Sequence, residues 1–315
     1  MTTGRLVRTS WGSATDRGRV RNLNEDSLLA YPPVFLVADG MGGHSAGDVA
    51  SRLAVEEFSQ LAGRTSASPD EIHACFHRTA SRLRGAVQAG RTAGTTVAGV
   101  AIAAHDGGSY WLVFNIGDSR VYRLAGGELE QISVDHSVVQ ELIDRGELSP
   151  HEAVGHPDRH VITRAVGTGA EPEPDYWLIP AGTADRVLVC SDGLTTELED
   201  TTLLRVLSTV ADPQEAAQVL VTAALEAGGK DNISAVVVDV AIATDSPDVE
   251  TTVRAPDRDV AVAGAVRRAD AARDAAWDEE IDGATIPRSP SAVGARATEP
   301  EGPAGPAGAS STEVP

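Results

Sequence analysis

Residues 34–51, VFLVADGMGGHSAGDVAS, carry the signals that decide the fold. The apolar run from Val34 to Ala38 is typical of a strand that is buried on both faces. The pair Asp39-Gly40 ends this run, and a helical pattern begins near Gly47 after a glycine-rich stretch. A buried strand followed by a helix predicts a domain that is built from both sheets and helices.

The same alternation continues along the chain to about Ile242. Apolar runs bounded by turn residues predict strands at 34–38, 95–104, 110–116, 120–124, 186–190 and 233–240. Helical patterns lie between them at 47–62, 69–89, 137–145, 200–210 and 213–227. The pairs Gly117-Asp118 and Gly126-Gly127 are hairpin signals, which favour antiparallel sheets over a doubly wound parallel sheet. We therefore expect an α+β fold, a four-layer α-β-β-α sandwich of two antiparallel sheets flanked by helices.

The composition places one domain boundary near Ala243. With 315 residues and 42% hydrophobic content, the chain can bury a substantial core. From Ala243 onward it is rich in Ala, Pro, Gly, Thr and acidic residues. We expect a folded domain at 1–242 and an acidic, mostly disordered tail at 243–315. Within the tail, residues 258–281 have the alanine, arginine and acid content of a lone amphipathic helix.

Charge and cysteine content limit the partners and the compartment. A net charge of −20 repels nucleic acid and anionic membrane surfaces, and it suits an acidic site that holds cations. Cys75 and Cys190 lie in apolar surroundings and are too few for a disulfide framework, so we expect reduced, buried thiols. No apolar stretch reaches the ~20 residues that cross a bilayer, and residues 1–10 lack a signal-peptide core. The expected location is the cytoplasm.

Acidic residues occupy four positions where a predicted strand ends or a loop begins: Glu25 beside Asp26, Asp39, Asp192 and Asp231. These positions are far apart in the sequence and can meet only in the fold. Converging carboxylates repel one another unless cations lie between them, and hard oxygen ligands select Mg²⁺ or Mn²⁺. A single Asp-Gly pair is more often a turn signal. Both Asp-Gly pairs of this set, however, follow an apolar strand, which a solvent-exposed turn does not require.

Together with further motifs in a fixed order, these residues resemble the metal-dependent, type 2C serine/threonine protein phosphatases, in their bacterial form. The resemblance extends from about Ser10 to Val240. Its motifs are RNLNEDS, VADGMGGHSAGDVAS, GTTVAGV, NIGDSRVYRL, SVDHSVVQELI, HVITRAVG, CSDGL and KDNISAVVV. No single motif suffices, but so many in one order make coincidence improbable.

The resemblance implies a centre of two metal ions, Mn²⁺ or Mg²⁺. It implies that Asp39 bridges both ions and that the Gly40 carbonyl binds one of them. It further implies that Glu25, Asp192 and Asp231 complete the ligand shells, directly or through water. Two cations suit phosphate ester hydrolysis because they lower the pKa of a bound water and offset charge on the phosphoryl oxygens.

The resemblance also implies roles for residues outside this metal pair. Arg21 should hold the substrate phosphate, which its planar guanidinium fits. Asp118 should bind a third, weaker ion, although Thr196 stands where many relatives carry an acid or asparagine. His44 is one candidate for the proton donor to the leaving group, since some relatives have a histidine where this chain has Met41. A loop histidine that orients a ligand or faces solvent is the equally weighted alternative.

The activity implied by the resemblance is hydrolysis of phosphoserine and phosphothreonine in proteins, which opposes Ser/Thr kinases. A non-catalytic phosphoprotein sensor on the same fold is the first alternative, and the retained carboxylates disfavour it. A specialised phosphatase acting on a regulator of a sigma-factor cascade is the second. The motifs GDSR and DHS favour the kinase-opposing type.

Two further segments have weaker assignments. The resemblance implies that residues 134–167 form a mobile flap beside the active site, in which His136, His156 and His160 hold the loop together rather than ligate metal. In the tail, residues 250–254, ETTVR, resemble threonine sites that bacterial kinases modify and phosphothreonine-binding domains read. A solvated linker with incidental threonines remains the favoured reading of that segment.

Overall fold

The computed structural model describes residues 6–42, 46–86, 93–105, 108–182 and 184–243. In chain order its elements are β1 (Leu6–Asp16), β2 (Asp26–Tyr31), β3 (Val34–Gly42), α1 (Ala46–Ser59), α2 (Pro69–Ala86), β4 (Ala93–Thr95), β5 (Val97–His105), β6 (Gly108–Ile116), β7 (Arg120–Ala125), β8 (Glu128–Gln131), α3 (Val138–Asp144), α4 (Pro150–Ala153), β9 (Asp175–Pro180), β10 (Arg186–Cys190), α5 (Asp192–Glu197), α6 (Asp200–Thr209), α7 (Pro213–Ala227) and β11 (Ile233–Ala243).

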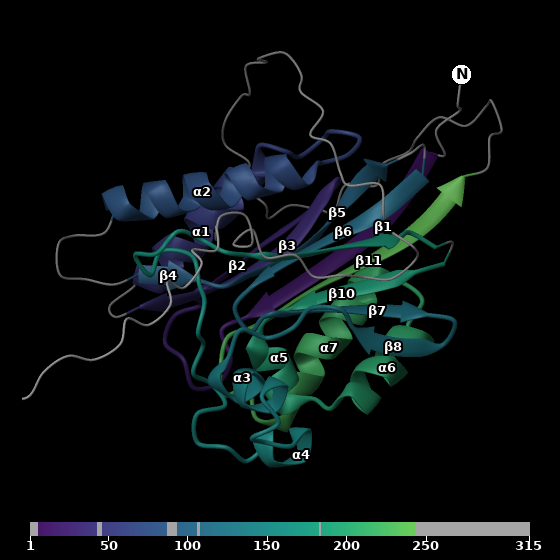
Figure 1. The fold of residues 1–315 in the computed structure, drawn as a ribbon. Coiled ribbons are helices and arrows are strands. Elements are labelled where there is room, and N and C mark those ends of the chain that lie inside the picture. Colours follow the sequence, from purple (N-terminus) through teal and green to yellow (C-terminus); the bar gives the residue numbers. More distant parts are fainter. Residues whose placement is uncertain (1–5, 43–45, 87–92, 106–107, 183, 244–315) are drawn as a thin grey trace, which may run out of the picture.

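The strands form two antiparallel sheets. One sheet has the order β1-β11-β10-β7-β8, and the other has the order β2-β3-β5-β6-β9, with β4 paired to β3. The register of β3 places Asp39 opposite Asp26 on one side, and β5 continues the sheet on the other. Helices α1 and α2 cover the sheet that contains β3, while α5, α6 and α7 cover the sheet that contains β11 (Figure 1).

The apolar runs of the inner strands are continuous because both of their faces are buried. In β3, Val34 and Leu36 pack toward α1 and α2, whereas Phe35 and Val37 pack into the space between the sheets. In β10, Val187 and Val189 face that same space and Leu188 faces the other helix layer. Alternation between two buried faces is the pattern expected for the middle of a sandwich.

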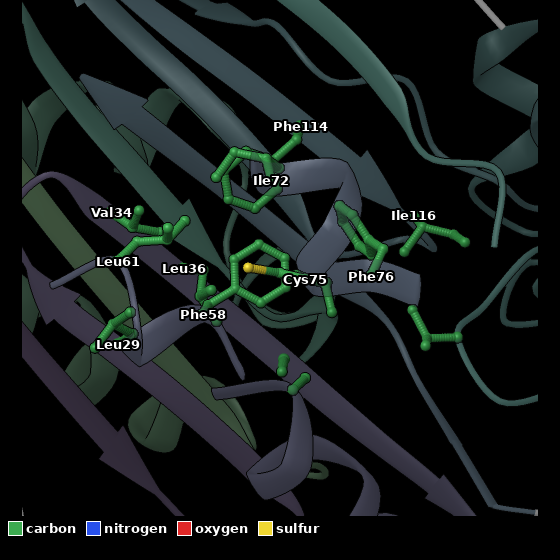
Figure 2. Close-up of a cluster of buried hydrophobic side chains, with 14 of the residues drawn as sticks. Leu29, Val34, Leu36, Phe58, Leu61, Ile72, Cys75, Phe76, Phe114 and Ile116 are labelled. Atoms are coloured by element: carbon green, nitrogen blue, oxygen red, sulfur yellow. The ribbon is translucent and has the colours of Figure 1, made fainter. Parts of the chain in front are cut away.

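Three apolar layers therefore hold the molecule together, one under α1 and α2, one under α5, α6 and α7, and one between the sheets. The layer under α1 and α2 contains the ring cluster of Phe58, Phe76 and Phe114, with centroids 5.1 to 6.0 Å apart (Figure 2). The four-layer α-β-β-α sandwich is confirmed. Cys75 and Cys190 are free and buried, as predicted. None of the helices in the described ranges has the length and apolar character needed to cross a membrane.

The predicted strands correspond to the six inner strands, and the four that were missed are the edges: β1, β8, β2 and β9. The short elements β4, α4 and α5 were also missed. The prediction that Gly117-Asp118 forms a hairpin is wrong, because β6 and β7 belong to different sheets and this link crosses between them. Gly126-Gly127 does join the paired strands β7 and β8. The tail beyond Ala243, including the helix expected at 258–281, lies outside the described residues, so the domain boundary stays a prediction.

Candidate active site

The acidic residues meet at one end of the sandwich, where β2 and β3 of one sheet approach β10 and β11 of the other. Asp26, at the start of β2, ties the sheets together. The hydroxyls of Ser191 and Ser234 donate hydrogen bonds to its Oδ2 at 2.8 and 2.7 Å. Its Oδ1 is buried and has no hydrogen-bond partner among the described residues.

Two threonines hold the backbone of Asp39 at the end of the apolar run of β3. The Asp39 N–H donates to Oγ1 of Thr96 at 3.1 Å, and Oγ1 of Thr95 donates to the Asp39 carbonyl at 3.0 Å. Thr96 Oγ1 also lies 2.8 Å from Oγ of Ser119, the neighbour of Asp118. Residues 94–97, GTTV, thus fix the position of Asp39 relative to residues 117–119, the link between β6 and β7 that carries Asp118.

That link requires glycine at position 117. Gly117 has φ +111°, and a Cβ there would lie 2.5 Å from the side chain of Thr96. Its N–H donates to Nδ1 of His136 at 3.2 Å, and its carbonyl accepts from the His136 N–H at 2.9 Å. Because Nδ1 is an acceptor, the Nε2–H of His136 donates to Asp175 at 3.1 Å. His136 therefore fastens the start of the flap to the sheets, as expected.

A second close approach brings Glu25 beside Gly40. A Cβ on Gly47, in the first turn of α1, would lie 2.8 Å from Oε1 of Glu25 and 2.6 Å from the Gly40 carbonyl oxygen. The Gly40 N–H donates to the Glu25 carbonyl at 3.1 Å, and Ser51 of α1 donates to the same carbonyl at 2.6 Å. A carboxylate oxygen and a backbone carbonyl therefore share one small space that glycine keeps open.

Asn232 organises the loop that carries Arg21 and Glu25. Its Oδ1 accepts from the Glu25 N–H at 2.8 Å, and its amide donates to the carbonyls of Arg17 and Leu23, both at 2.9 Å. The adjacent Asp231 accepts from Arg21 Nη2 at 2.6 Å. Half of the Arg21 side chain is exposed, so its guanidinium faces solvent as well as the carboxylates.

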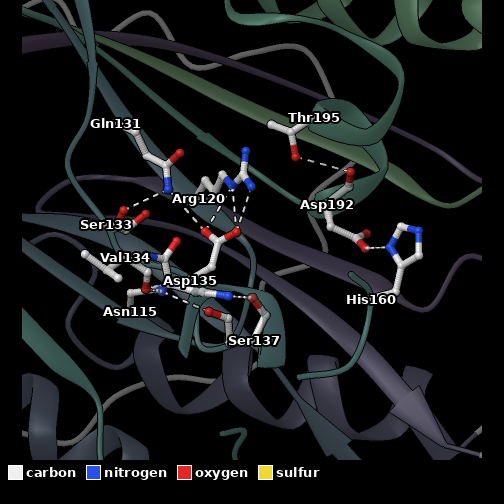
Figure 3. Close-up of polar contacts among 12 residues, drawn as sticks. Asn115, Arg120, Gln131, Ser133, Val134, Asp135, Ser137, His160, Asp192 and Thr195 are labelled. Atoms are coloured by element: carbon white, nitrogen blue, oxygen red, sulfur yellow. Dashed lines mark hydrogen bonds and ion pairs between the residues drawn. The ribbon is translucent and has the colours of Figure 1, made fainter. Parts of the chain in front are cut away.

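Asp192 begins α5, where the N-terminus of a helix favours negative charge. Oδ2 of Asp192 lies 3.9 Å from Nδ1 of His160, which comes from the flap (Figure 3). Arg120 donates hydrogen bonds from Nε and Nη2 to the Asp135 carboxylate at 2.7 to 3.0 Å. Its Nη1 donates to the Tyr122 hydroxyl at 3.2 Å. The contact with Asp192 places a histidine of the 134–167 segment beside the acidic residues.

The carboxylates are close enough to change one another's protonation. Burial, followed by repulsion from Asp26, Asp192, Asp118 and Asp231, holds the pKa of Asp39 well above its usual range. Burial and then the charge of Asp192 raise the pKa of Asp118 to about 8. Burial raises the pKa of Asp26 to about 7, against the lowering effect of its two serine donors. The far-separated acidic residues of the sequence therefore share one electrostatic site.

The donor set fits hard divalent cations. All of the converging groups offer oxygen, one buried oxygen of Asp26 lacks a partner, and Arg21 is the main countercharge. No three histidine, cysteine or acidic side chains of the described ranges already stand at the separations of a metal-binding group. Burial and the neighbouring carboxylates raise the pKa values of Asp39, Asp118 and Asp192 instead, so the metal-free site favours bound protons. Cations that replaced such protons would relieve the repulsion.

The structure thus brings together Arg21, Glu25, Asp39, Gly40, Asp118, Asp192 and Asp231. His44 lies outside the described residues. Thr196 is exposed on α5. Four supporting residues were missed in the sequence, namely Thr96, Ser191, Asn232 and Ser234. The proximity of His160 to Asp192 was also missed, because nothing in a loop sequence shows how far a flap folds back.

Comparison with known proteins agrees with this geometry. The family model described as protein phosphatase 2C matches residues 19–227. The chain belongs to the protein phosphatase 2C family. A relative in this family, the serine/threonine phosphatase stp of Listeria monocytogenes, is 36% identical over 235 residues, which cover 71% of this chain and 93% of the relative.

Solved structures of the family share the fold. The Mycobacterium tuberculosis serine/threonine phosphatase PstP/Ppp has a TM-score of 0.67 and 36% identity, and the match covers 74% of this chain and 99% of that one. A PstP catalytic domain solved in complex with two manganese ions has a TM-score of 0.65 and 35% identity, covering 75% and 99% of the two chains. The two-metal chemistry of the family thus has a structural example close to this chain.

Proposed function

We propose that this chain hydrolyses phosphoserine and phosphothreonine in proteins and uses two divalent cations, Mn²⁺ or Mg²⁺, held at the acidic end of the sandwich. One observation carries the proposal, which is the convergence of Asp118, Asp192 and Asp231 on the buried Asp39, whose pKa their charges raise. A phosphoprotein-binding sensor has no use for such a concentration of negative charge. Family membership supports the same activity.

The acidic residues and the Gly40 carbonyl are the proposed ligands of the cations. Asp39 occupies the position between the two sheets and is the proposed bridge, with the Gly40 carbonyl and Glu25 on the α1 side. Asp192 and Asp231 close the opposite side, and Asp118 is the proposed ligand of a third, weaker ion. When bound, the two cations lower the pKa of a water molecule and offset charge on the phosphoryl oxygens.

Arg21 is the proposed phosphate-binding group. Its pKa is raised by the hydrogen bond to Asp231 and by the charges of Asp231, Asp39 and Asp192, so it stays charged at any working pH. The exposed half of its side chain lets a phosphate from solvent reach the guanidinium. Its two parallel N–H groups suit two phosphoryl oxygens, a geometry that lysine does not offer.

The leaving serine or threonine oxygen needs a proton, and two histidines are candidates for its donor. His44 follows β3, which carries Asp39 and Gly40, and keeps its proposed role. The described residues add His160, which reaches the site from the flap and lies 3.9 Å from Asp192. We expect a residue in that place to contact the phosphoprotein as well, which would link substrate choice with catalysis.

The cellular role that we propose is reversal of Ser/Thr kinase signalling in the cytoplasm of a bacterium, with kinases and their substrates as the phosphorylated partners. The motifs GDSR and DHS support this role over a phosphatase dedicated to a sigma-factor regulator. We further propose that residues 243–315 form a separate acidic tail. Thr251, Thr252 and Thr285 in it are candidate kinase sites, and mass spectrometry after kinase treatment tests them.

A direct test measures phosphate release from phosphoserine, phosphothreonine and phosphotyrosine peptides, each with Mn²⁺, with Mg²⁺ and with a chelator. We expect turnover of the first two peptides with metal, little with phosphotyrosine, and none with the chelator. Binding of the phosphopeptides without turnover under every metal condition would support the sensor instead. Activity that survives the chelator would remove the two-cation mechanism.

A further inference from the structure

Two histidines form a cluster on α2, in contact with the edge strand β9 and its preceding segment rather than with the acidic residues. His73 and His77 are one turn apart, so their rings share one face of the helix. Their Nε2 atoms face each other at 2.8 Å, and the ring centroids are 4.5 Å apart. The proposed phosphatase mechanism uses neither residue.

The outer nitrogen of each ring has a partner of its own. Nδ1 of His77 lies 2.9 Å from the carboxylate of Glu171, and Nδ1 of His73 lies 3.1 Å from the hydroxyl of Tyr176. Tyr176 is on β9 with its side chain packed against the α1 and α2 layer, and burial raises the pKa of its hydroxyl. Histidines that bind metal ions almost always donate their outer N–H to a carboxylate, a backbone carbonyl or water, and the contact of His77 with Glu171 has this form.

We propose that His73 and His77 bind a divalent transition-metal ion through their two Nε2 atoms. The class of ion is one that prefers imidazole nitrogen, such as Cu²⁺, Ni²⁺ or Zn²⁺, in contrast to the oxygen-binding Mg²⁺ and Mn²⁺ of the acidic site. Two histidines four residues apart on a helix share one face, and a rotation of the rings turns both nitrogens toward one ion. The site is thus chemically and spatially distinct from the phosphatase centre.

The protons balance without charging either ring. In the metal-free protein His77 donates its Nδ1–H to Glu171, so its Nε2 accepts the Nε2–H of His73, and Tyr176 donates to Nδ1 of His73. When the ion binds, the Nε2 proton of His73 is exchanged with water for a proton on Nδ1, and the Tyr176 oxygen becomes its acceptor. Burial and the neighbouring His77 lower the pKa of His73 against the raising effect of Asp70, which favours the neutral ring that binds a metal ion.

The separation of the two nitrogens indicates which geometry the pair accepts. Two nitrogens at about 2.0 Å from an ion are about 2.8 Å apart at a right angle and about 3.3 Å apart at a tetrahedral angle. The observed 2.8 Å is the length of the hydrogen bond between the rings, so a tetragonal Cu²⁺ or Ni²⁺ ion requires the rings to turn without moving apart, whereas Zn²⁺ also requires them to open by about half an ångström. Within the described residues no third histidine, cysteine or acidic group completes a closed set. Water therefore fills the remaining positions and the ion is exchangeable.

The test uses Cu²⁺ as the probe on the full-length protein, with Mg²⁺ in excess to occupy the acidic site. Electron paramagnetic resonance at one equivalent of Cu²⁺ reports nitrogen ligands through their hyperfine splitting. We expect splitting from imidazole nitrogen in the wild type. We expect its loss, with at least about 10-fold weaker copper binding, in His73→Gln and in His77→Gln. His156→Gln, which removes a flap histidine, is the matched control and should keep the signal.

Circular dichroism and thermal unfolding show whether the variants are folded. An oxygen-only copper spectrum in the wild type overturns the proposal, as does a nitrogen signal that persists unchanged in both folded variants. If the α2 variants do not fold, Glu171→Ala replaces them, because this side chain is exposed. The proposal then expects copper binding to weaken by about 10-fold, and wild-type affinity in that variant contradicts it.

Discussion

At the scale of single residues, the acidic site combines carboxylates that cannot all be ionised without cations. Asp26 and Asp118 have pKa values of about 7 and about 8, far above the ordinary aspartate value. Such groups bind protons in the folded protein that the unfolded chain has already lost. Their electrostatics therefore link folding, metal binding and pH.

These shifts predict how metal stabilisation depends on pH. Because their folded-state pKa values are raised, Asp26 and Asp118 contribute most to the stability of the metal-free protein below the ordinary aspartate pKa, and this contribution is lost as pH rises through about 7 to 8. Cations compete with those same protons. Differential scanning calorimetry with a chelator and with Mn²⁺ should show a gap between the two Tm values that widens from pH 6 to pH 8. A gap that is constant or narrows with pH contradicts the shared-site account.

The ligand carboxylates could be found in the sequence because each follows an apolar strand or lies in a motif. Asp39 and Asp192 both come after buried runs, where a polar residue needs a reason. Thr96, Asn232 and Ser234 could not be found in this way, because a hydroxyl or amide at a strand end has many local uses. Only the fold shows that they hold the backbone of Asp39, the backbone of Glu25 and the side chain of Asp26.

At the scale of elements, the end of β3 is positioned by the strand beside it. Thr96, between β4 and β5, is almost fully buried and holds both the Asp39 N–H and the Ser119 hydroxyl. The same residue therefore sets the distance between β3 and the link that carries Asp118. A change at this position should act on catalysis through geometry rather than through charge.

Thr96→Val keeps the shape of the side chain and removes its oxygen. We expect kcat to fall by about 10- to 100-fold, as for groups that orient metal ligands, and stability to fall by about 1–3 kcal/mol because a buried N–H loses its acceptor. KM for a phosphopeptide should change less than kcat. Thr96→Ser retains the oxygen and serves as the control. Wild-type kcat in a folded Thr96→Val protein would show that this contact does not position Asp39.

Whether a strand could be predicted from the sequence depends on its place in the sheet. All six inner strands were predicted, because strands buried on both faces form continuous apolar runs. The four edge strands were missed, and for β8, with the sequence ELEQ, the reason is that the strand is short and polar. The crossover at Gly117-Asp118 was misread as a hairpin because the same turn residues serve both purposes.

At the scale of the whole molecule, apolar layers join the two sheets and their helices, and a buried arginine ties α6 to the sheet that contains β10 and β11. Arg186 of β10 is 8% exposed and binds both oxygens of Asp239 on β11 at 2.6 and 2.8 Å. It also donates to the carbonyls of Leu207, Val210 and Ala211 at the end of α6. One side chain thus connects two strands and a helix.

Arg186→Met should destabilise the protein by about 3–5 kcal/mol, because it leaves Asp239 and three carbonyls without their donor. Denaturant unfolding with Mn²⁺ present measures the change. Arg52→Met is the matched control. Arg52 is exposed and pairs with Asp48 one turn away on α1, so its loss should cost no more than about 0.5 kcal/mol. Similar costs for the two variants would show that Arg186 is not a structural link.

The acidic site joins both sheets, so its function depends on the complete sandwich. Asp39 comes from one sheet, whereas Asp192 and Asp231 adjoin strands of the other. Cations bound between them should stabilise the whole molecule and permit catalysis at once. Metal binding and turnover are therefore expected to be lost together.

The most direct test is isothermal calorimetry of Mn²⁺ binding to the wild type, Asp39→Asn and Asp200→Asn, with phosphopeptide hydrolysis measured on the same samples. Asp200 is an exposed aspartate at the start of α6 and is the matched control. We predict about two tightly bound ions in the wild type and in Asp200→Asn. Asp39→Asn should lose the tight sites and at least about 10³-fold of the activity. Wild-type Mn²⁺ binding and turnover in Asp39→Asn would contradict the account.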